Sequence, residues 1–451
     1  MRPMSRRSFL QVSARSAGGM VLGAAALTAA SAARVQGAGD RIALALVGAG
    51  GRGRELALKF LKVENVEFKC VCDVEAEHAG YAVKEIEKAQ GRAPAQVADL
   101  RQALDDKDVH GIVVATPEHW HALATVWGCQ AGKDVYVEKN ISMTPWEGRK
   151  MIEAAAKYKR IVQCGTQNRS APYAYTARDY LKNGKLGKVV LVKSYNMLGG
   201  VAWKPAADTD PPKGLDWDRW LGPAPKVPYN PGRHRGWGAW WDYGGGSLSG
   251  DASHTLDLVR LVLGDPPAPK SVCAAGGNLA FGSACEAPEL QAITFEFDGF
   301  VVTMDNTAFP PYMKKTPPEI RYSDKFPAWR QNSTRIEIYG TELLMYVGRH
   351  GGGWQVFAAD EKLVDQGTGY FPDKWHQPNF IECMRTRAKP NGDIEAGHAS
   401  ANLIHLANAS YRVGNRKLLW DGKGEKFTNC DEANALLARE HRAPYRIADA
   451  V

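Results

Sequence analysis

Two side chains have the type and setting for proton chemistry, Lys139 and His254. Lys139 follows Tyr136-Val137-Glu138, where a charged pair leaves an apolar strand. An ammonium there can hold a substrate hydroxyl and lower its pKa as hydride leaves; the simpler alternative is a Glu138–Lys139 salt bridge. His254 opens an apolar helix after a glycine-rich loop that starts at Gly244. Its imidazole is either a proton acceptor at neutral pH or a helix cap.

A second cluster follows another predicted strand. It reads Thr116-Pro117-Glu118-His119-Trp120-His121. Open parallel sheets bind ligands at the carboxyl edge of their strands, so this loop is predicted to line a cofactor. His119 and His121 also suggest a metal site. Side chains two residues apart rarely converge on a metal without a third ligand, and the sequence supplies none nearby, so we predict no metal.

The glycine-rich turn after the apolar run Ile42–Val47 indicates which cofactor. It reads Gly48-Ala49-Gly50-Gly51-Arg52-Gly53. In G-x-G-x-x-G the first glycine makes a tight turn, the second admits a pyrophosphate, and the third packs helix against strand. A predicted helix, Arg54–Lys62, and a second strand lead to Asp73, whose carboxylate suits a ribose 2′-hydroxyl and repels a 2′-phosphate. The segment predicts NAD in preference to NADP; a purely structural glycine turn is the alternative.

An aromatic segment in the second half of the chain suits a carbohydrate. Aromatic faces with polar side chains between them match sugar rings, whose apolar C–H patches are edged by hydroxyls. A domain-swapped arm or a subunit interface explains the segment equally well, and it is compatible with a carbohydrate site. The segment contains Trp217, Trp220, Tyr229, Arg233, His234, Arg235, Trp237, Trp240, Trp241, Asp242 and Tyr243.

The elements that must position these residues fall into two kinds. Up to Gly165, strands and helices alternate, which is typical of a doubly wound parallel sheet, an α/β fold. The predicted strands after the first two are 110–116, 134–137 and 161–165, and the predicted helices are 76–89, 99–104, 122–131 and 145–158.

Beyond Gly165 the pattern changes to a mostly antiparallel sheet with a few helices, an α+β domain. A hairpin is expected over 292–304, turning at Asp298-Gly299. Further strands are expected at 189–196, 335–339, 342–347 and 353–358, and helices at 253–263, 378–387 and 398–414.

The N-terminus resembles a twin-arginine export signal. Ser5-Arg6-Arg7-Ser8-Phe9-Leu10-Gln11 precedes a mild apolar stretch, and Ala30-Ser31-Ala32 offers a cleavage site. A membrane-spanning first helix is the alternative, although the stretch is short and weakly apolar for a permanent span. We predict export to the periplasm, with residues 1–37 as signal, 38–165 as the NAD-binding domain and 166–451 as the second domain.

The charge balance argues against a nucleic-acid partner. The chain carries a formal net charge of +8. Four arginines lie before the proposed cleavage site, so the mature chain would carry +4. No Lys/Arg cluster stands out in it, and no other apolar run is long enough to span a bilayer.

Together these motifs resemble the glucose–fructose oxidoreductase/inositol dehydrogenase (Gfo/Idh/MocA) family over essentially the whole mature chain. Segments at 165–170, 220–224 and 393–398 resemble its exported branch. The resemblance implies a Rossmann domain plus an open-faced sheet domain that often pairs subunits, and hence a homo-oligomer.

The resemblance also implies site residues. Lys139 matches the family's catalytic lysine and His254 its catalytic histidine. Two positions depart from the pattern: Asn140 stands where proline is usual, which can loosen the turn, and Gly250 stands where an aspartate usually precedes the histidine, with Asp251 one residue late. The implied cofactor set is Gly48, Gly50, Gly51, Arg52, Gly53, Asp73, Thr116, Pro117, His119, Trp120, His121, Glu138, Lys139, Gln167 and Asn168. The implied substrate set is Arg169, His234, Arg235, Trp240, Tyr243, Asp251 and His254.

Three functions fit these observations. The first is an exported sugar or polyol oxidoreductase that holds NAD tightly and regenerates it internally, because no nicotinamide pool is expected outside the cytoplasm. The second is a redox-neutral NAD-dependent glycosidase or lyase, in which transient oxidation acidifies a neighbouring C–H, elimination breaks the glycosidic bond, and hydride returns. The third is a catalytically silent sugar-binding protein.

Overall fold

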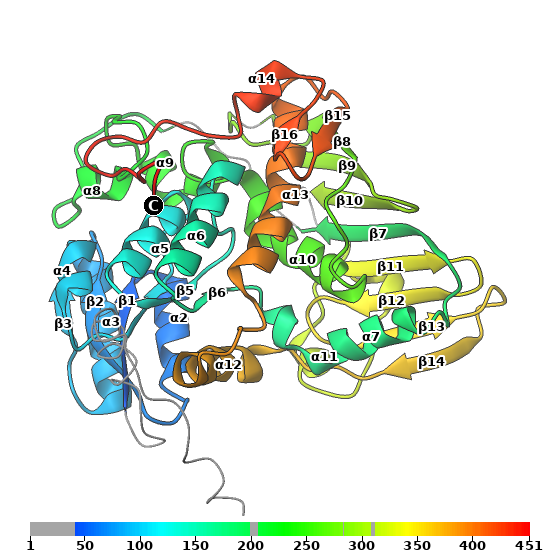
Figure 1. The fold of residues 1–451 in the computed structure, drawn as a ribbon, viewed down its shortest axis with the longest axis horizontal. Helices are drawn as coiled ribbons and strands as arrows, with labels where there is room; N and C mark the ends of the chain where they lie inside the picture. The colour runs from blue at the N-terminus through cyan, green and yellow to red at the C-terminus, as the bar shows by residue number, and fades with distance from the viewer. Residues whose placement is uncertain (1–40, 199–205, 283, 308–311) are drawn as a thin grey trace, which may run out of the picture. The chain divides into compact units, whose positions relative to one another are not determined.

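The first half of the chain forms a parallel sheet, as predicted. In the computed structural model, residues 41–198, 206–282, 284–307 and 312–451 are described (Figure 1). The sheet has the order β3-β2-β1-β4-β5-β6, and all its pairings are parallel. Its strands are β1 (Ile42–Val47), β2 (Val66–Cys72), β3 (Ala95–Val97), β4 (Gly111–Val114), β5 (Asp134–Val137) and β6 (Val162–Cys164).

Helices cover both faces of this sheet because its strands are apolar on both sides. All six residues of β1 are buried; Ala45 and Val47 pack into one core, Leu44 and Leu46 into the other. The covering helices are α2 (Gly51–Phe60), α3 (Ala76–Gln90), α4 (Leu100–Asp105), α5 (His121–Gln130) and α6 (Pro145–Lys157). The observed α2 begins three residues before the predicted helix, so the end of the glycine motif lies in its first turn.

The second half forms the predicted, mostly antiparallel sheet. Its order is β14-β13-β12-β11-β7-β10-β9-β8-β15-β16, and only β7 and β10 pair in parallel among its described strands. The strands are β7 (Val189–Met197), β8 (Ser271–Gly277), β9 (Leu290–Glu296), β10 (Val301–Thr307), β11 (Arg335–Gly340), β12 (Leu344–Gly348), β13 (Trp354–Phe357), β14 (Leu363–Gly367), β15 (Leu418–Asp421) and β16 (Lys426–Phe427). The expected hairpin is β9–β10, with Gly299 at φ +86° in its turn.

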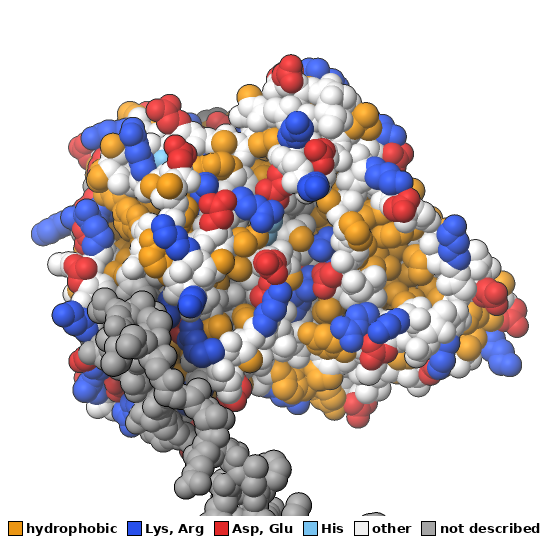
Figure 2. Space-filling model, viewed as in Figure 1, with side chains coloured by type: hydrophobic (Ala, Val, Ile, Leu, Met, Phe, Trp, Pro, Cys, Tyr) orange, Lys and Arg blue, Asp and Glu red, His pale blue; other side chains and the backbone are white. Residues whose placement is uncertain are grey.

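One face of this sheet is buried under helices α7 (Pro172–Lys182), α10 (Ser253–Val262) and α13 (Ile394–Arg412). The sequence does not predict α7, and α13 begins four residues before the predicted helix. Asp393 sets the true start of α13, because its carboxylate accepts the backbone N–H groups of Glu395 and Ala396. On the face shown in Figure 2, Lys/Arg and Asp/Glu side chains are interspersed.

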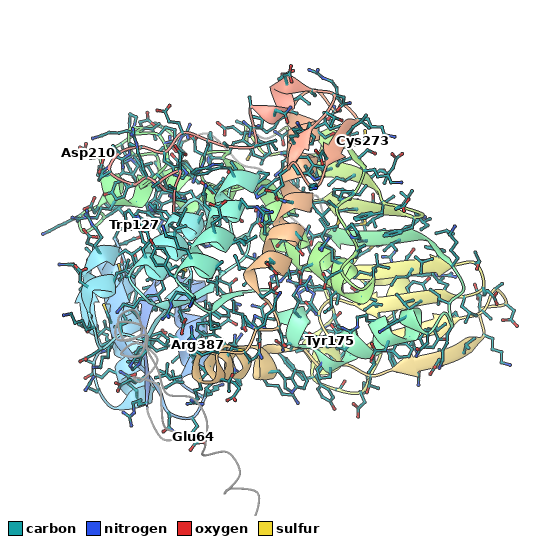
Figure 3. The ribbon with its side chains drawn as sticks, in the orientation of Figure 1. Glu64, Trp127, Tyr175, Asp210, Cys273 and Arg387 are labelled. Atoms are coloured by element: carbon teal, nitrogen blue, oxygen red, sulfur yellow. The ribbon has the colours of Figure 1, made fainter. Side chains whose placement is uncertain are left out.

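The chain returns to the parallel sheet near its C-terminus. Helix α12 (Asp373–Thr386) packs Phe380 and Met384 into the core beneath α2 and α3. Arg387, labelled in Figure 3, then binds both carboxylate oxygens of Asp134, at 2.6 and 2.9 Å. The tail places Tyr445, Ile447 and Val451 in the opposite core. The cores on both faces of the parallel sheet therefore include residues from the far end of the chain.

The proposed export signal lies outside the described residues. Among the residues that are described, none of the helices combines the length and apolarity that a membrane crossing requires.

Candidate active site

Each glycine of the turn after β1 has a distinct geometric role. Gly48 has φ +88°, and a Cβ there would lie 2.6 Å from the Thr116 nitrogen. A Cβ on Gly53 would lie 1.9 Å from the carbonyl oxygen of Gly48, so this glycine permits α2 to pack against the turn. A Cβ on Gly50 would meet nothing within 4 Å. The open space beside Gly50, at the start of α2, can take a pyrophosphate.

Asp73 lies at the end of β2 beside this turn. Its carboxylate accepts the backbone N–H of Ala49 at 2.6 Å and that of Glu75 at 2.8 Å. Burial raises the pKa of Asp73, while these hydrogen bonds oppose the rise. The carboxylate is thus fixed at the rim of the phosphate turn, where the predicted ribose contact needs it.

A cavity of about 360 Å³ runs from Asp73 to Lys139. Of the predicted cofactor residues, it is lined by Gly48, Gly50, Gly51, Arg52, Asp73, Thr116, Pro117, Trp120, His121, Glu138 and Lys139. It is also lined by residues that the sequence analysis did not assign to the cofactor, among them Glu75, His78, Arg219, Trp220, His234, Trp237 and Tyr445. The open cradle at Gly50 and the fixed carboxylate of Asp73 fit a bound NAD.

The aromatic segment forms the outer wall of this cavity. Trp217 and Trp220 stack at 4.6 Å between ring centroids and belong to a small core with Tyr229 and Tyr243. Trp120 Nε1 donates to the carbonyl oxygen of Trp220 at 3.0 Å, which holds the segment to the 116–121 loop. The C-terminal tail also binds the aromatic segment, because Arg442 forms an ion pair with Asp218 at 2.8 Å. The segment encloses the cofactor cavity, a role that its composition alone did not reveal.

Within the aromatic segment, the four predicted substrate residues are not gathered at one surface. His234 lines the cofactor cavity and lies 3.5 Å from Glu75. Arg235 is exposed, and the Arg233 guanidinium lies 4.3 Å from the Trp240 ring centroid. Tyr243 is fully buried against His119 and Trp220. These packing contacts replace the sugar platform expected from the sequence.

Other predicted residues also lie away from the cavity. Gln167 and Asn168 are buried, and Asn168 donates to the hydroxyl of Tyr173 and to the carbonyl of Arg349. Arg169 is 3% exposed and binds Asp257 at 2.7 Å and Asp265 at 2.8 Å. A guanidinium committed to two carboxylates is not available to a substrate, so the structure corrects that assignment.

His119 and His121 do not converge. His119 Nε2 lies 2.8 Å from the Trp220 carbonyl oxygen and donates to it, and burial lowers the pKa of His119 to about 3. The two ring nitrogens of His121 face the carbonyl oxygens of Asn140 and Thr116, at 2.7 and 2.8 Å. Among the described residues, no three His, Cys, Asp or Glu side chains are grouped as a metal site would require.

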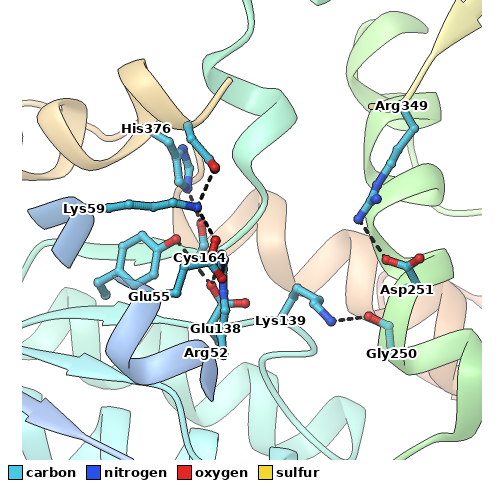
Figure 4. Close-up of polar contacts among 12 residues, drawn as sticks. Arg52, Glu55, Lys59, Glu138, Lys139, Cys164, Gly250, Asp251, Arg349 and His376 are labelled. Carbon is cyan, nitrogen blue, oxygen red and sulfur yellow. Dashed lines mark hydrogen bonds and ion pairs between the residues drawn. The ribbon is translucent and has the colours of Figure 1, made fainter. Parts of the chain in front are cut away.

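The charged pair after β5 is divided between two partners (Figure 4). Glu138 binds Arg52 at 2.8 Å; burial alone would raise the pKa of Glu138, but Arg52 and Lys139 hold it below its ordinary value. Lys139 instead donates to the carbonyl oxygen of Gly250. The local salt bridge considered from the sequence is therefore not formed. Asn140 does not loosen the turn, because its side chain donates to Ser142 O and its carbonyl faces His121.

His254 is the second residue of α10. Burial lowers the pKa of His254 well below its ordinary value; the positive charges of Arg349 and Lys139 add to this effect, and Asp251 opposes it. A π-helical turn, Leu248–Ala252, runs directly into α10 and carries Gly250 and Asp251.

Asp251 is committed to cations. Arg349 Nη2 donates to its Oδ1 at 2.9 Å, and Lys315 Nζ lies 2.7 Å from its Oδ2. These partners overcome the effect of burial and hold the pKa of Asp251 well below its usual range. The sequence analysis placed Asp251 in the substrate set but named neither Arg349 nor Lys315, which are distant in sequence and belong to no local motif.

This arrangement is a parallel α/β domain whose cavity extends from a phosphate turn to Lys139. Two family models match: "Oxidoreductase family, NAD-binding Rossmann fold" over residues 42–166, and "Oxidoreductase family, C-terminal alpha/beta domain" over 182–299 and 341–447. The matches span well over half of the chain, which therefore belongs to the Gfo/Idh/MocA family. The predicted family, fold and NAD cofactor are confirmed.

Individual relatives match a smaller part of the chain than the family models do. The chain is 27% identical over 169 residues to a levoglucosan dehydrogenase from Pseudarthrobacter phenanthrenivorans, covering 37% of this chain and 36% of that protein. It is 24% identical over 173 residues to a glycosyl hydrolase family 109 protein from Shewanella pealeana, covering 35% and 38%. The chain thus matches little more than a third of the length of these relatives.

Among solved structures, the fold resembles the WlbA dehydrogenase from Bordetella pertussis, determined in complex with NADH and UDP-GlcNAcA. The TM-score is 0.59 at 20% identity, covering 84% of this chain and 99% of that one. At this identity the likeness establishes the fold.

Proposed function

We propose that the chain is an exported oxidoreductase that removes hydride from a sugar or polyol hydroxyl and keeps its NAD bound between turnovers. The observation that carries the proposal is the inner end of the cofactor cavity. Lys139 lines that cavity and donates to the carbonyl of Gly250, which lies four residues before His254. A hydrogen-bond donor thus lies in the cavity, and the candidate proton acceptor follows its bonding partner at the start of α10.

Each residue then has a separate task. Bound NAD supplies the hydride acceptor. Lys139 donates a hydrogen bond to the reacting hydroxyl and stabilises its developing negative charge, while His254, neutral because of its low pKa, takes the hydroxyl proton. Arg52 and Glu138 neutralise one another, so the Lys139 ammonium, which is bonded to the Gly250 carbonyl and not to Glu138, can turn to the substrate hydroxyl.

Retention of the cofactor is supported by the outer wall of the cavity. Trp220 and Trp237 line it from the aromatic segment, and Tyr445 from the tail. The segment is held by backbone pairing as well, since Asp216 N donates to Val74 O at 2.9 Å and Ala76 N to Gly214 O at 2.9 Å. Release of NAD would require these contacts to open, so we expect slow exchange.

A second function, redox-neutral glycoside cleavage, is favoured by the glycosyl hydrolase names among the relatives. The two functions differ in their products. With an aryl glycoside, the oxidoreductase should accumulate reduced bound cofactor without releasing aglycone. The glycosidase should release aglycone catalytically with no net reduction, and that result would replace the first proposal. Silent sugar binding predicts neither signal.

Export is tested separately. We propose that Arg6 and Arg7 direct the chain to the periplasm through the twin-arginine route. The double variant Arg6→Lys, Arg7→Lys should remain in the cytoplasm on cell fractionation, whereas wild type should appear in the periplasm. Equal distribution of both proteins would contradict the proposal. We also propose a homo-oligomer, which light scattering of the mature chain would test.

A further inference from the structure

We propose that the substrate is an anionic sugar, and that Arg349 and Lys315 bind its negative group. This inference rests on the proposed function, because it concerns the substrate of the same site. It derives from the two cations that contact Asp251, three residues before His254 in the chain.

The first step is the geometry around one carboxylate. Arg349 follows β12 in the turn that leads to β13, and it reaches Asp251 at 2.9 Å. Lys315, from a separate stretch of chain, reaches the other oxygen of the same carboxylate at 2.7 Å. Figure 4 shows Arg349 and Lys139 reaching the Gly250–Asp251 turn from two different elements. Two cations therefore share a single carboxylate next to the catalytic histidine.

The second step is the charge balance. Arg52 is neutralised by Glu138. Lys139 is bonded to a carbonyl group and to no carboxylate among the described residues. A further carboxyl among the described residues here is Glu118, which is buried and accepts from Ser249 Oγ. Even with Glu118 counted as ionised, Lys139, Arg349 and Lys315 outnumber the two carboxylates of Asp251 and Glu118.

The third step is the cost of that surplus. Arg349 is 5% exposed, and its Nε has no hydrogen-bond partner among the described residues. A buried cation with an unsatisfied donor is unfavourable unless a further anion or acceptor joins it. Lys315 is partly exposed, with 39% of its side chain accessible, so it can turn from Asp251 toward an arriving ligand. A carboxylate or phosphate on the sugar would satisfy both groups.

The competing explanation is that the surplus charge serves only the developing alkoxide, and that the substrate is neutral. That task belongs to Lys139, whereas Arg349 and Lys315 are directed to Asp251. Matched neutral and anionic sugars separate the two explanations.

The experiment measures reduction of bound NAD in the full-length holoenzyme by a neutral hexose, the corresponding hexuronate and the hexose 6-phosphate. We expect one anionic sugar to half-saturate the enzyme at a concentration at least about tenfold lower than the neutral hexose does. The sugar that does so identifies the bound anion as a carboxylate or a phosphate. In Lys315→Gln this preference should fall about tenfold. Lys314→Gln, which changes an exposed neighbouring lysine, should retain it.

Two results would overturn the inference. One is a wild-type enzyme that accepts the neutral hexose as well as or better than both anionic sugars, which leaves the oxidoreductase proposal intact. The other is an anionic preference that Lys315→Gln does not alter. If no sugar reduces the cofactor, the proposed function itself fails. Calorimetric binding of the hexuronate and the 6-phosphate to wild type and Lys315→Gln then still tests the anion site.

Discussion

The cofactor side and the substrate side of this site differ in how they are assembled. On the cofactor side, one continuous stretch from β1 to Asp73 supplies the turn, the start of α2 and the carboxylate. On the substrate side, three separate stretches supply Lys139, His254 and Arg349. Charge is balanced on the first side, where Arg52 meets Glu138, and positive on the second. Binding of NAD and transfer of hydride should therefore be separable by mutation.

The largest effect is expected on the substrate side. Lys139→Met and His254→Asn should each slow reduction of bound NAD by about 10²- to 10⁴-fold, because each removes a proton-transfer or hydrogen-bonding group at the reacting hydroxyl. The NAD content of the purified variants should equal that of wild type. Lys62→Met, which changes an exposed lysine beyond α2, serves as the control. Undiminished rates in both site variants would favour silent binding.

An effect on the stability of the whole fold is expected where the C-terminal tail is bound to α6 (Pro145–Lys157). Glu147 on α6 binds Arg439 at 2.6 Å and His441 at 2.8 Å, and Arg439 also donates to the carbonyl of His119. Glu147→Gln should lower the free energy of unfolding by about 3–5 kcal/mol, because it leaves the Arg439 guanidinium without its anion. Glu153→Gln, on the exposed face of the same helix, should change it by less than about 1 kcal/mol.

The pH dependence of this effect has a definite sign. Burial alone would raise the pKa of Glu147, but Arg439 and His441 outweigh it and lower the pKa to about 2. A carboxylate with a depressed pKa stabilises the fold above its unfolded value and loses that contribution as the pH falls through the folded value. The difference between wild type and Glu147→Gln in denaturant melts should therefore shrink as the pH falls from 4.5 toward 2. A difference that stays constant over this range would contradict the ion-pair explanation.

On the cofactor side, the variant Gly50→Val tests NAD affinity separately from the stability of the fold. The new side chain meets no protein atom within 4 Å of its Cβ, so stability should be unchanged, but it fills the space for the pyrophosphate. We expect NAD affinity to fall about 10- to 100-fold by calorimetry on cofactor-depleted protein. Gly80→Val, at another glycine with open space on α3, should leave affinity unchanged. Equal affinities for Gly50→Val and wild type would place the pyrophosphate elsewhere.

The smallest effect is a shift of the pH–rate profile. Burial, reinforced by Arg349 and Lys139, keeps the pKa of His254 well below its ordinary value, so the imidazole stays neutral as the pH is lowered through 6.5. The rate of NAD reduction should stay flat there, and Arg349→Gln should move the acid limb to higher pH because a nearby positive charge is lost. If the acid limb of the wild-type pH–rate profile were centred near the ordinary pKa of histidine, the buried, positively charged environment of His254 would be contradicted.

The same contrast explains what the sequence could predict. Strand, glycine turn, helix and Asp73 are consecutive, so local pattern was sufficient to predict the NAD site and the parallel sheet. Arg349 lies about a hundred residues from Asp251, and Tyr445 reaches the cavity from the tail; no local pattern encodes either contact. The aromatic segment was recognised by composition, but stacking of Trp217 on Trp220 made it a wall of the cofactor cavity.

The central claim is that NAD remains bound and receives hydride from a sugar at Lys139 and His254. The direct measurement is the dinucleotide content of protein purified through gel filtration, followed by its absorbance on addition of neutral and anionic sugars in a single turnover. We predict close to one NAD per chain, and its reduction by at least one sugar in wild type but not in Lys139→Met. Protein that carries no dinucleotide and does not bind added NAD would contradict the account.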